Sequence, residues 1–232
     1  MKPSLRSLSL LGLLVIPFGL MACADLQMRP QPAPPSPDAV SSPGNTASAP
    51  GAVAPSSVPV SWSQILGETS APEGWRVEPC VNPTLLCVYE GDEIVGTVEL
   101  FTEPVEGSQF GNILAEEGGQ PIPALRRWIE LHYETIRSDR QIGMPTTRFT
   151  SEPPEETAVG NLPGLRYGFT TTHENGALID RSIGYMATDG TTLYVIATGM
   201  ISQDPAGSFS SQEKTQQFLP HLAKIISGLN FN

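Results

Sequence analysis

Hydrophobic and polar residues alternate along much of the chain after residue 61, and this pattern predicts β-strands. Strand-like segments lie at 74–78, 86–89 and 94–101, and then at 164–172, 177–187 and 191–199. The charged turn at 90–93 joins the second and third segments into a hairpin. Asn175-Gly176 and Asp189-Gly190 supply the positive φ that tight turns between the last three segments need. We therefore expect a β-hairpin followed by an antiparallel meander.

Two segments with helical spacing of apolar residues can cover this sheet. The first, at 124–137, places five residues on one stripe: Leu125, Trp128, Ile129, His132 and Ile136. The second follows a capping box of Ser210 and Glu213, and Pro220 is expected to kink it or to mark a restart of the helix. The strand at 191–199 is apolar on both faces, so both faces should be covered. The predicted fold class is α+β, an antiparallel β-sheet covered by helices in an α/β/α sandwich.

The N-terminus has the layout of a secretory signal. Lys2 and Arg6 precede an apolar run at 8–20, which is shorter than the roughly 20 residues that a membrane-spanning helix needs. Leu20-Met21-Ala22-Cys23 follows and resembles the lipobox of bacterial lipoproteins, in which the cysteine thiol receives diacylglycerol before cleavage. The resemblance implies that Cys23 becomes the acylated first residue, although Met21 departs from the small residue usual there. The alternative is an ordinary secreted protein in which Cys23 is a free thiol.

A proline-rich segment separates the signal from the strand-rich region. Nine prolines among residues 30–59, mixed with Ser, Ala and Gly, cannot build a core and predict a disordered linker. We therefore predict a signal peptide at 1–22, a lipidated cysteine and linker at 23–60, and a globular domain at 61–232.

Charge narrows the range of partners. Cleavage before Cys23 removes two basic residues and no acid, which leaves 11 basic against 24 acidic residues and a formal charge of −13. Such a field repels phosphate backbones, so we expect no nucleic-acid partner. It also repels anionic headgroups, so membrane attachment should come from the acyl chains, palmitate among them, on Cys23.

The two remaining cysteines, Cys80 and Cys87, are expected to form a disulfide in an oxidising compartment outside the cytosol. Asn82 and Pro83 between them favour the turn that brings the two thiols together. A redox dithiol would have C-x-x-C spacing, and a zinc site would need further ligands nearby.

Motifs that carry catalysis are missing from the sequence, and we predict a non-enzymatic protein with no cofactor and no metal. The three histidines, His132, His173 and His221, fall on separate elements. His173-Glu174 begins the zinc pattern H-E-x-x-H, but Ala177 stands where the second histidine would be. No G-x-S-x-G elbow or glycine-rich phosphate loop is present.

An acidic segment between the hairpin and the first helix is the candidate for partner binding. It carries Glu103, Glu106, Glu116 and Glu117 and shows no secondary-structure pattern, so we interpret it as a long loop. The alternative is a solvated connection. Glu152, Glu155 and Glu156, beside Pro153 and Pro154, are interpreted as a solvated loop as well.

Three short pieces of the C-terminal domain carry a family resemblance: the opening residues 72–75, Pro-Glu-Gly-Trp, the strand 193–196 and the closing helix through 225–231. With these pieces in this order, the domain resembles the PsbP-like fold, named for an extrinsic subunit of photosystem II. It implies a binding or assembly module for a membrane-associated complex, with photosystem association as a secondary expectation. The cysteine pair is not part of the photosystem subunit's pattern, and no metal-binding residues of that family match here.

Taken together, these features predict a lipid-anchored envelope protein facing the periplasm, the cell surface or the thylakoid lumen, acting as a binding or assembly factor. A carrier of a small ligand or glycan is the first alternative, and an unrecognised hydrolase is the second. A deep apolar pocket would favour the carrier, and buried carboxylates paired with His or Arg in a cleft would favour the enzyme.

Overall fold

The computed structural model describes residues 60–201 and 206–231. The predicted signal peptide, Cys23 and the linker therefore lie outside the described residues. No helix among the described residues is long and apolar enough to cross a membrane.

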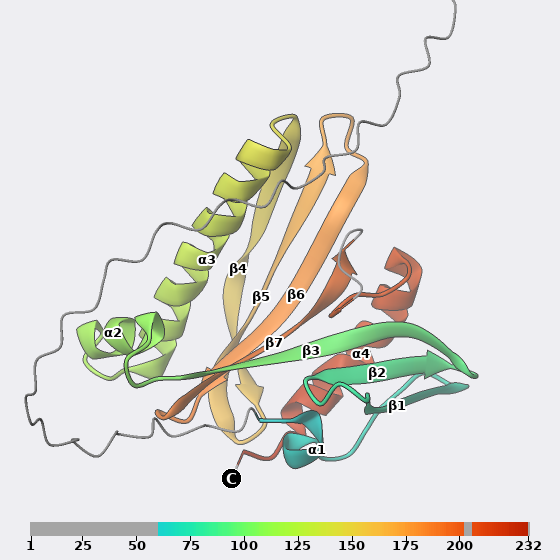
Figure 1. The fold of residues 1–232 in the computed structure, drawn as a ribbon, viewed down its shortest axis with the longest axis horizontal. Helices are drawn as coiled ribbons and strands as arrows, with labels where there is room; N and C mark the ends of the chain where they lie inside the picture. The colour runs from blue at the N-terminus through green and yellow to red at the C-terminus, as the bar shows by residue number, and fades with distance from the viewer. Residues whose placement is uncertain (1–59, 202–205, 232) are drawn as a thin grey trace, which may run out of the picture. The chain divides into compact units, whose positions relative to one another are not determined.

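The described strands form one antiparallel sheet in the order β1-β2-β3-β7-β6-β5-β4 (Figure 1). Their bounds are β1 Trp75–Pro79, β2 Leu85–Glu90, β3 Glu93–Pro104, β4 Thr147–Val159, β5 Leu162–His173, β6 Leu178–Thr188 and β7 Thr192–Ile201. The predicted hairpin is β2 and β3, and the predicted meander is β5, β6 and β7. The two parts join where β3 pairs with β7, for example Glu99 with Ala197.

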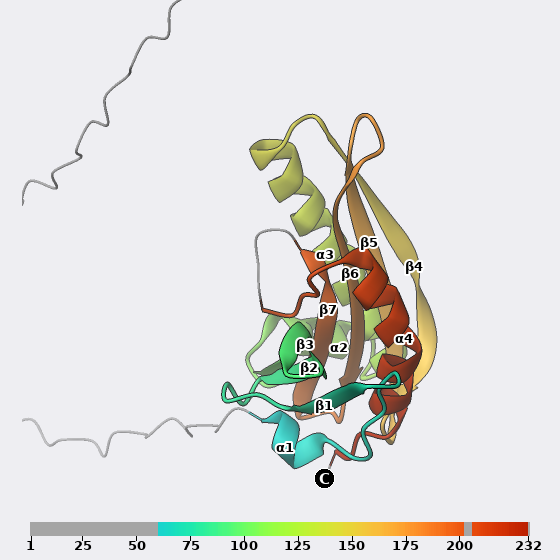
Figure 2. The same cartoon turned by 90° about the vertical axis from the view of Figure 1, so that its right-hand side faces the viewer.

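Helices cover both faces, so the predicted fold class is confirmed. They are α1 Trp62–Ile65, α2 Gln109–Glu116, α3 Pro121–Gly143 and α4 Gln212–Ser227. Figure 2 shows α3 and α4 on opposite sides of the sheet. One core packs α1 and α4 against residues such as Leu100, Ile183 and Ile196, and the other packs α2 and α3 against residues such as Leu165 and Met186. Alternate residues of the same strands enter the two cores, as the period of two requires.

The edge strand β4 was not predicted, and the interpretation of Glu152, Glu155 and Glu156 as a loop is wrong. These residues lie in β4, which pairs with β5 on both sides of a bulge between Glu152 and Glu155. The bulge holds Pro153 and Pro154, which have no N–H to donate to the ladder. Proline is tolerated because β4 is an edge strand and the ladder is already interrupted there.

The helices differ from the prediction mainly at their ends. Helix α3 begins at Pro121, in the first turn where proline's missing N–H costs nothing, and continues to Gly143. Helix α4 is capped by Ser211, whose hydroxyl accepts the N–H of Lys214. The cap therefore lies one residue after the predicted Ser210, and the predicted capping box of Ser210 with Glu213 is wrong, because Lys214 occupies the N3 position. Pro220 lies inside α4 on its exposed side without ending the helix.

Candidate binding surface

The predicted acidic segment is folded, and its interpretation as a loop without secondary structure is wrong. Ser108 caps α2 by accepting the N–H of Gly111, and Phe110 and Ile113 anchor that helix in the core. The pattern was hard to see because α2 has only eight residues and two buried anchors.

The four acidic residues fall into two pairs. Glu116 and Glu117, at the end of α2, both contact Arg127 of α3, at 2.7 and 3.4 Å. The hydrogen bond to Glu116 is the largest cause of the raised pKa of Arg127. Glu103 is the second-last residue of β3 and Glu106 lies just beyond that strand, and both side chains are exposed. The structure thus gives Glu116 and Glu117 a cation on their own chain and leaves Glu103 and Glu106 facing solvent.

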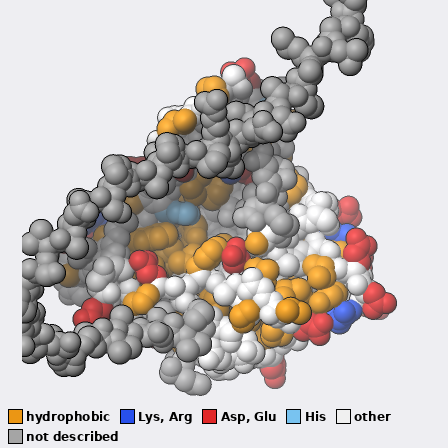
Figure 3. All heavy atoms as spheres, in the orientation of Figure 1, with side chains coloured by type: hydrophobic (Ala, Val, Ile, Leu, Met, Phe, Trp, Pro, Cys, Tyr) orange, Lys and Arg blue, Asp and Glu red, His pale blue; other side chains and the backbone are white. Residues whose placement is uncertain are grey.

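A hollow lined by hydrophobic side chains opens between α3 and β3 (Figure 3). The strand register assigns its floor to the α3 side of β6 and β7, where Gly184 pairs with Ala197 and Met186 pairs with Val195. Val195 and Ala197 are only half-buried. The floor is therefore made of small and aliphatic side chains that α2 and α3 do not fully cover.

Aromatic rings form the α3 side of this hollow. Trp128 stacks on His132 with ring centroids 5.1 Å apart, and His132 meets the edge of Tyr167 at 6.0 Å. Tyr167 lies over Gly184, because a Cβ placed on that glycine would collide with the tyrosine ring. Burial lowers the pKa of His132 and raises that of Tyr167, so both groups are neutral near pH 7.

The opposite side of the hollow is β3, whose α3-facing residues include Glu99, Phe101 and Glu103. They alternate with Val98 and Leu100, which enter the α4-side core. Phe101 pairs with Val195 of β7, and 49% of its surface is exposed. A large aromatic ring half in solvent on a central strand, between two carboxylates, is suited to contact with a partner. We call the residues that line this concave surface the α3-side hollow: Phe101, Trp128, His132, Tyr167, Gly184 and Val195.

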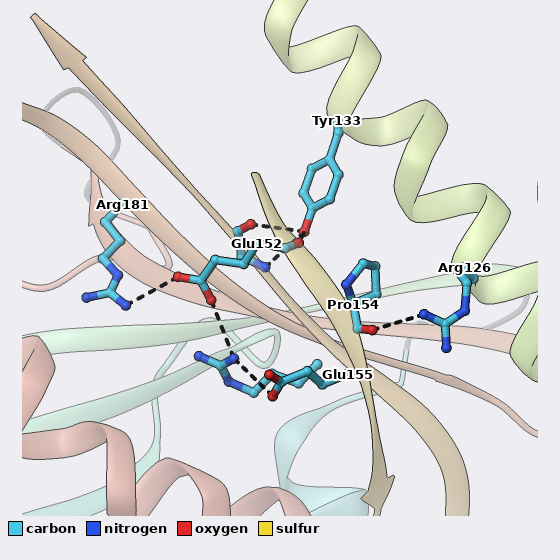
Figure 4. Close-up of polar contacts among 8 residues, drawn as sticks. Arg126, Tyr133, Glu152, Pro154, Glu155 and Arg181 are labelled. Carbon is cyan, nitrogen blue, oxygen red and sulfur yellow. Dashed lines mark hydrogen bonds and ion pairs between the residues drawn. The ribbon is translucent and has the colours of Figure 1, made fainter. Parts of the chain in front are cut away.

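A second cluster of polar groups, at the β4 bulge, has a structural role (Figure 4). The hydroxyl of Tyr133 lies 2.8 Å from the carbonyl of Glu152 and 2.9 Å from that of Gly168, and accepts the N–H of Gly168 at 3.1 Å. It replaces the ladder partners that the bulge removes. Arg126 donates to the carbonyl of Pro154 at 3.0 Å and so covers the strand edge just beyond.

The carboxylate of Glu152 also joins two arginines, Arg166 at 3.4 Å and Arg181 at 3.3 Å. Arg166 lines a groove of about 390 Å³ under α4, together with Tyr185 and Pro220. Because the guanidinium groups are paired with a carboxylate of their own chain, the cluster ties β4, β5 and β6 together.

The histidines stay apart, as their sequence positions suggested. His221 of α4 contacts the hydroxyl of Ser70 through Nδ1 at 2.8 Å, at the border of a cavity of about 710 Å³ lined by Glu68 and Lys224. His173 ends β5 in an exposed turn. Within residues 60–201 and 206–231, no three His, Cys, Asp or Glu side chains come together in a way that could hold a metal ion.

Cys80 and Cys87 form the predicted disulfide, with their Cα atoms 5.2 Å apart. The bridge pins the turn between β1 and β2, in which the N–H of Cys80 donates to the carbonyl of Leu85. Val81, at the tip of this turn, is fully exposed.

Comparison with known proteins gives a distant likeness in fold. No protein-family model matches the chain, and no curated protein sequence matches it. The chain is similar to the solution structure of cyanobacterial PsbP (CyanoP) from Synechocystis sp. PCC 6803, with a TM-score of 0.41 and 7% identity over 78% of this chain and 98% of that one. It is also similar to a protein from Bacteroides thetaiotaomicron VPI-5482, with a TM-score of 0.31 and 9% identity over 70% of this chain and 44% of that one. The first structure bears the name of the family that the sequence resembles. Neither likeness is near enough to carry an argument about function.

Sequence reasoning found the aromatic stripe of α3 but missed the α3-side hollow. Trp128 and His132 were assigned to the helix face that packs on the sheet, and they do lie there. Nothing local in the sequence marks Phe101 as their counterpart, because it reaches this surface through the pairing of β3 with β7. The one available signal was the apolar character of both faces of the strand at 191–199.

Proposed function

We propose that this chain is a lipid-anchored envelope protein that works as a non-enzymatic binding or assembly factor for a membrane-associated complex. The α3-side hollow is the observation that carries the proposal. It presents apolar and aromatic surface in a concave site, where contact with a partner would remove that surface from water. Association with a photosystem is a narrower form of this proposal and rests on the sequence resemblance alone.

Two further features support an anchored protein outside the cytosol. The Cys80–Cys87 disulfide is typical of oxidising compartments. The lipobox-like residues ending at Cys23 supply the attachment point, and the net negative charge of the chain gives no overall attraction to anionic lipid. Cys23→Ser should abolish incorporation of a labelled fatty acid, because serine lacks the thiol that accepts diacylglycerol. Equal labelling of both proteins would refute the anchor.

The carrier remains the second candidate, because the hollow and the groove under α4 both offer concave surface. The groove of about 390 Å³ is large enough for part of a small ligand. A carrier should retain a small molecule through purification, which native mass spectrometry of the exported chain would detect. A binding factor should instead retain a protein.

Site-specific photo-crosslinking tests the proposal in the native membrane. A photo-reactive amino acid replaces Phe101, at the rim of the hollow, in the full chain with its anchor intact. The control is the same replacement at Gln217, an exposed position on α4. We expect a discrete crosslinked protein from position 101 and none of the same mass from position 217. Identical products from the two positions, or none from position 101, would refute a binding role for this face.

A further inference from the structure

We infer that the α3-side hollow binds a basic amphipathic segment of a protein partner, with the apolar side of that segment in the hollow and its Lys or Arg residues over β3. This inference rests on the proposed function and names the chemistry of the partner. Three observations carry it: the shape of the floor, the exposed ring on β3, and the distribution of charge around the rim.

The floor has room at Ala197, whose side chain is a single methyl group. Gly184 and Ala197 are cross-strand partners at the centre of the sheet, and only the Ala197 position leaves space that a larger side chain would fill. Tyr167 occupies the part above Gly184, and Ala197 remains half-buried beside it. A single large aliphatic or aromatic side chain from a partner would fit a recess of this kind, as anchors do when a helix lies in a groove.

The two sides of the hollow are apolar, and the elements that carry them hold their side chains in place. Trp128 and His132 stack on each other along α3, and His132 meets the buried ring of Tyr167. Phe101 is held by strand β3, which pairs with β2 and β7. Binding here would therefore not require these side chains of α3 and β3 to become ordered first. Rigid aromatic residues of this kind contribute most of the binding energy at many interfaces.

The charge around the hollow selects a cationic partner. Glu103 lies two residues from Phe101 on the same face of β3, and Glu106 follows that strand; both side chains are exposed. Arg127 of α3 is already engaged by Glu116 and Glu117 of its own chain. Arg137, near the other end of α3, lies over the ring of Phe149 at 5.4 Å.

The same charge disfavours the other occupants. A second copy of this acidic chain would bring carboxylates toward carboxylates, and an anionic membrane surface would be repelled in the same way. A segment with Lys or Arg beside an apolar stripe satisfies both the apolar floor and the acidic rim.

The test uses the chain with Cys23→Ser, exported behind a signal peptide that is cleaved without lipidation, so that neither an acyl chain nor the apolar run 8–20 competes for apolar surface. The probes are two synthetic peptides with the same leucine spacing of an amphipathic helix, one with lysine and the other with glutamate at every polar position. Binding is measured by calorimetry at low and high salt, and Trp128 provides a fluorescence signal from inside the hollow. Thermal unfolding of each variant confirms that it is folded.

Two variants and a matched control localise the binding. Phe101→Ser removes the half-exposed ring. Glu103→Lys with Glu106→Lys reverses the charge at the rim of the hollow. The control, Glu174→Lys with Glu213→Lys, makes the same change of net charge at exposed positions in the β5–β6 turn and on α4. We expect the lysine peptide alone to bind, and each of the two variants to weaken it about tenfold or more. The control should change affinity about twofold at most, since distant charges are screened.

Equal binding of the lysine and glutamate peptides would overturn the inference. An equal loss of affinity in the rim variant and in the control would also overturn it, because it would indicate attraction by net charge alone. Self-association that Phe101→Ser abolishes would assign the hollow to a second copy and would also overturn it. These failures are distinct from failure of the proposed function. If position 101 crosslinks to a protein in membranes while the lysine peptide does not bind, the binding role stands and the partner chemistry is wrong.

Discussion

Replacing Tyr133 with phenylalanine should destabilise the domain by breaking the hydrogen bonds that close the β4 bulge. The tyrosine ring is 5% exposed, and its hydroxyl accepts the N–H of Gly168 while donating to the carbonyl of Glu152 or Gly168. Because Pro153 and Pro154 have no N–H groups, the backbone of β4 offers no replacement donor at this point. Phenylalanine keeps the packing of the ring and removes only the hydroxyl.

The size of the effect follows from what is left unpaired. A buried backbone group without a partner costs about 1–3 kcal/mol, whereas losing an ordinary hydrogen bond that solvent can replace costs about 0.5–1.5 kcal/mol. Gly168 is buried, and the ring that remains would keep water away from its N–H. We therefore expect the free energy of unfolding to fall by about 2 kcal/mol, within the range for an unsatisfied buried donor.

Urea unfolding followed by tryptophan fluorescence measures this change, with Tyr194→Phe as the matched control. Tyr194 is also 5% exposed, but its hydroxyl donates to the carboxylate of Asp189, which keeps bonds from the backbone of Thr191 and Thr192. The control should cost about 1 kcal/mol or less, because Asp189 is exposed, so water can replace the lost donor and no buried group is left unpaired. Equal destabilisation by the two substitutions would refute the role assigned to the Tyr133 hydroxyl.

Three further predictions concern other parts of the domain. Gly184→Ala should lower the free energy of unfolding by about 1–3 kcal/mol in urea titrations, because its Cβ collides with the ring of Tyr167. Cys87→Ala should cost about 2–3 kcal/mol by the same assay, since it opens the short Cys80–Cys87 loop, and reduced wild type should match it. Burial lowers the pKa of His132 in the folded state, so its contribution to stability is present above the unfolded pKa of about 6.5 and is lost as the pH falls below it. His132→Phe should therefore flatten the pH dependence of the thermal midpoint below pH 6.5.

Most of the sheet and both long helices could be predicted, because their signals are local. Asn175-Gly176 and Asp189-Gly190 mark tight turns wherever they occur, and the stripe around Ile129 repeats with helical period. The ends of the helices were predicted less well, because neighbouring residues can often serve equally as the cap. In α4 the cap is Ser211 and not Ser210.

Strand β4 was missed because several residues within it are typical of loops rather than of strands. Pro153 and Pro154 lie in the middle of the strand and argue against a ladder, and neighbouring glutamates suggest exposure. The strand forms because α3 compensates for the defect from outside the sheet. Tyr133 and Arg126 donate hydrogen bonds to the carbonyls of Glu152 and Pro154. These donors belong to α3, so no sequence pattern within residues 147–159 predicts them.

The α3-side hollow depends on long-range pairing in the same way. Phe101 and Val195 are cross-strand neighbours although 94 positions separate them, and Gly184 reaches the floor through β6. Gly184 does not have a positive φ, so its backbone does not require glycine. What requires glycine is the ring of Tyr167, which lies where a Cβ would be. The glycine therefore sets the shape of the aromatic side of the hollow, and a substitution there should alter peptide binding and stability together, whereas Phe101→Ser, at a half-exposed ring, should alter binding more than stability.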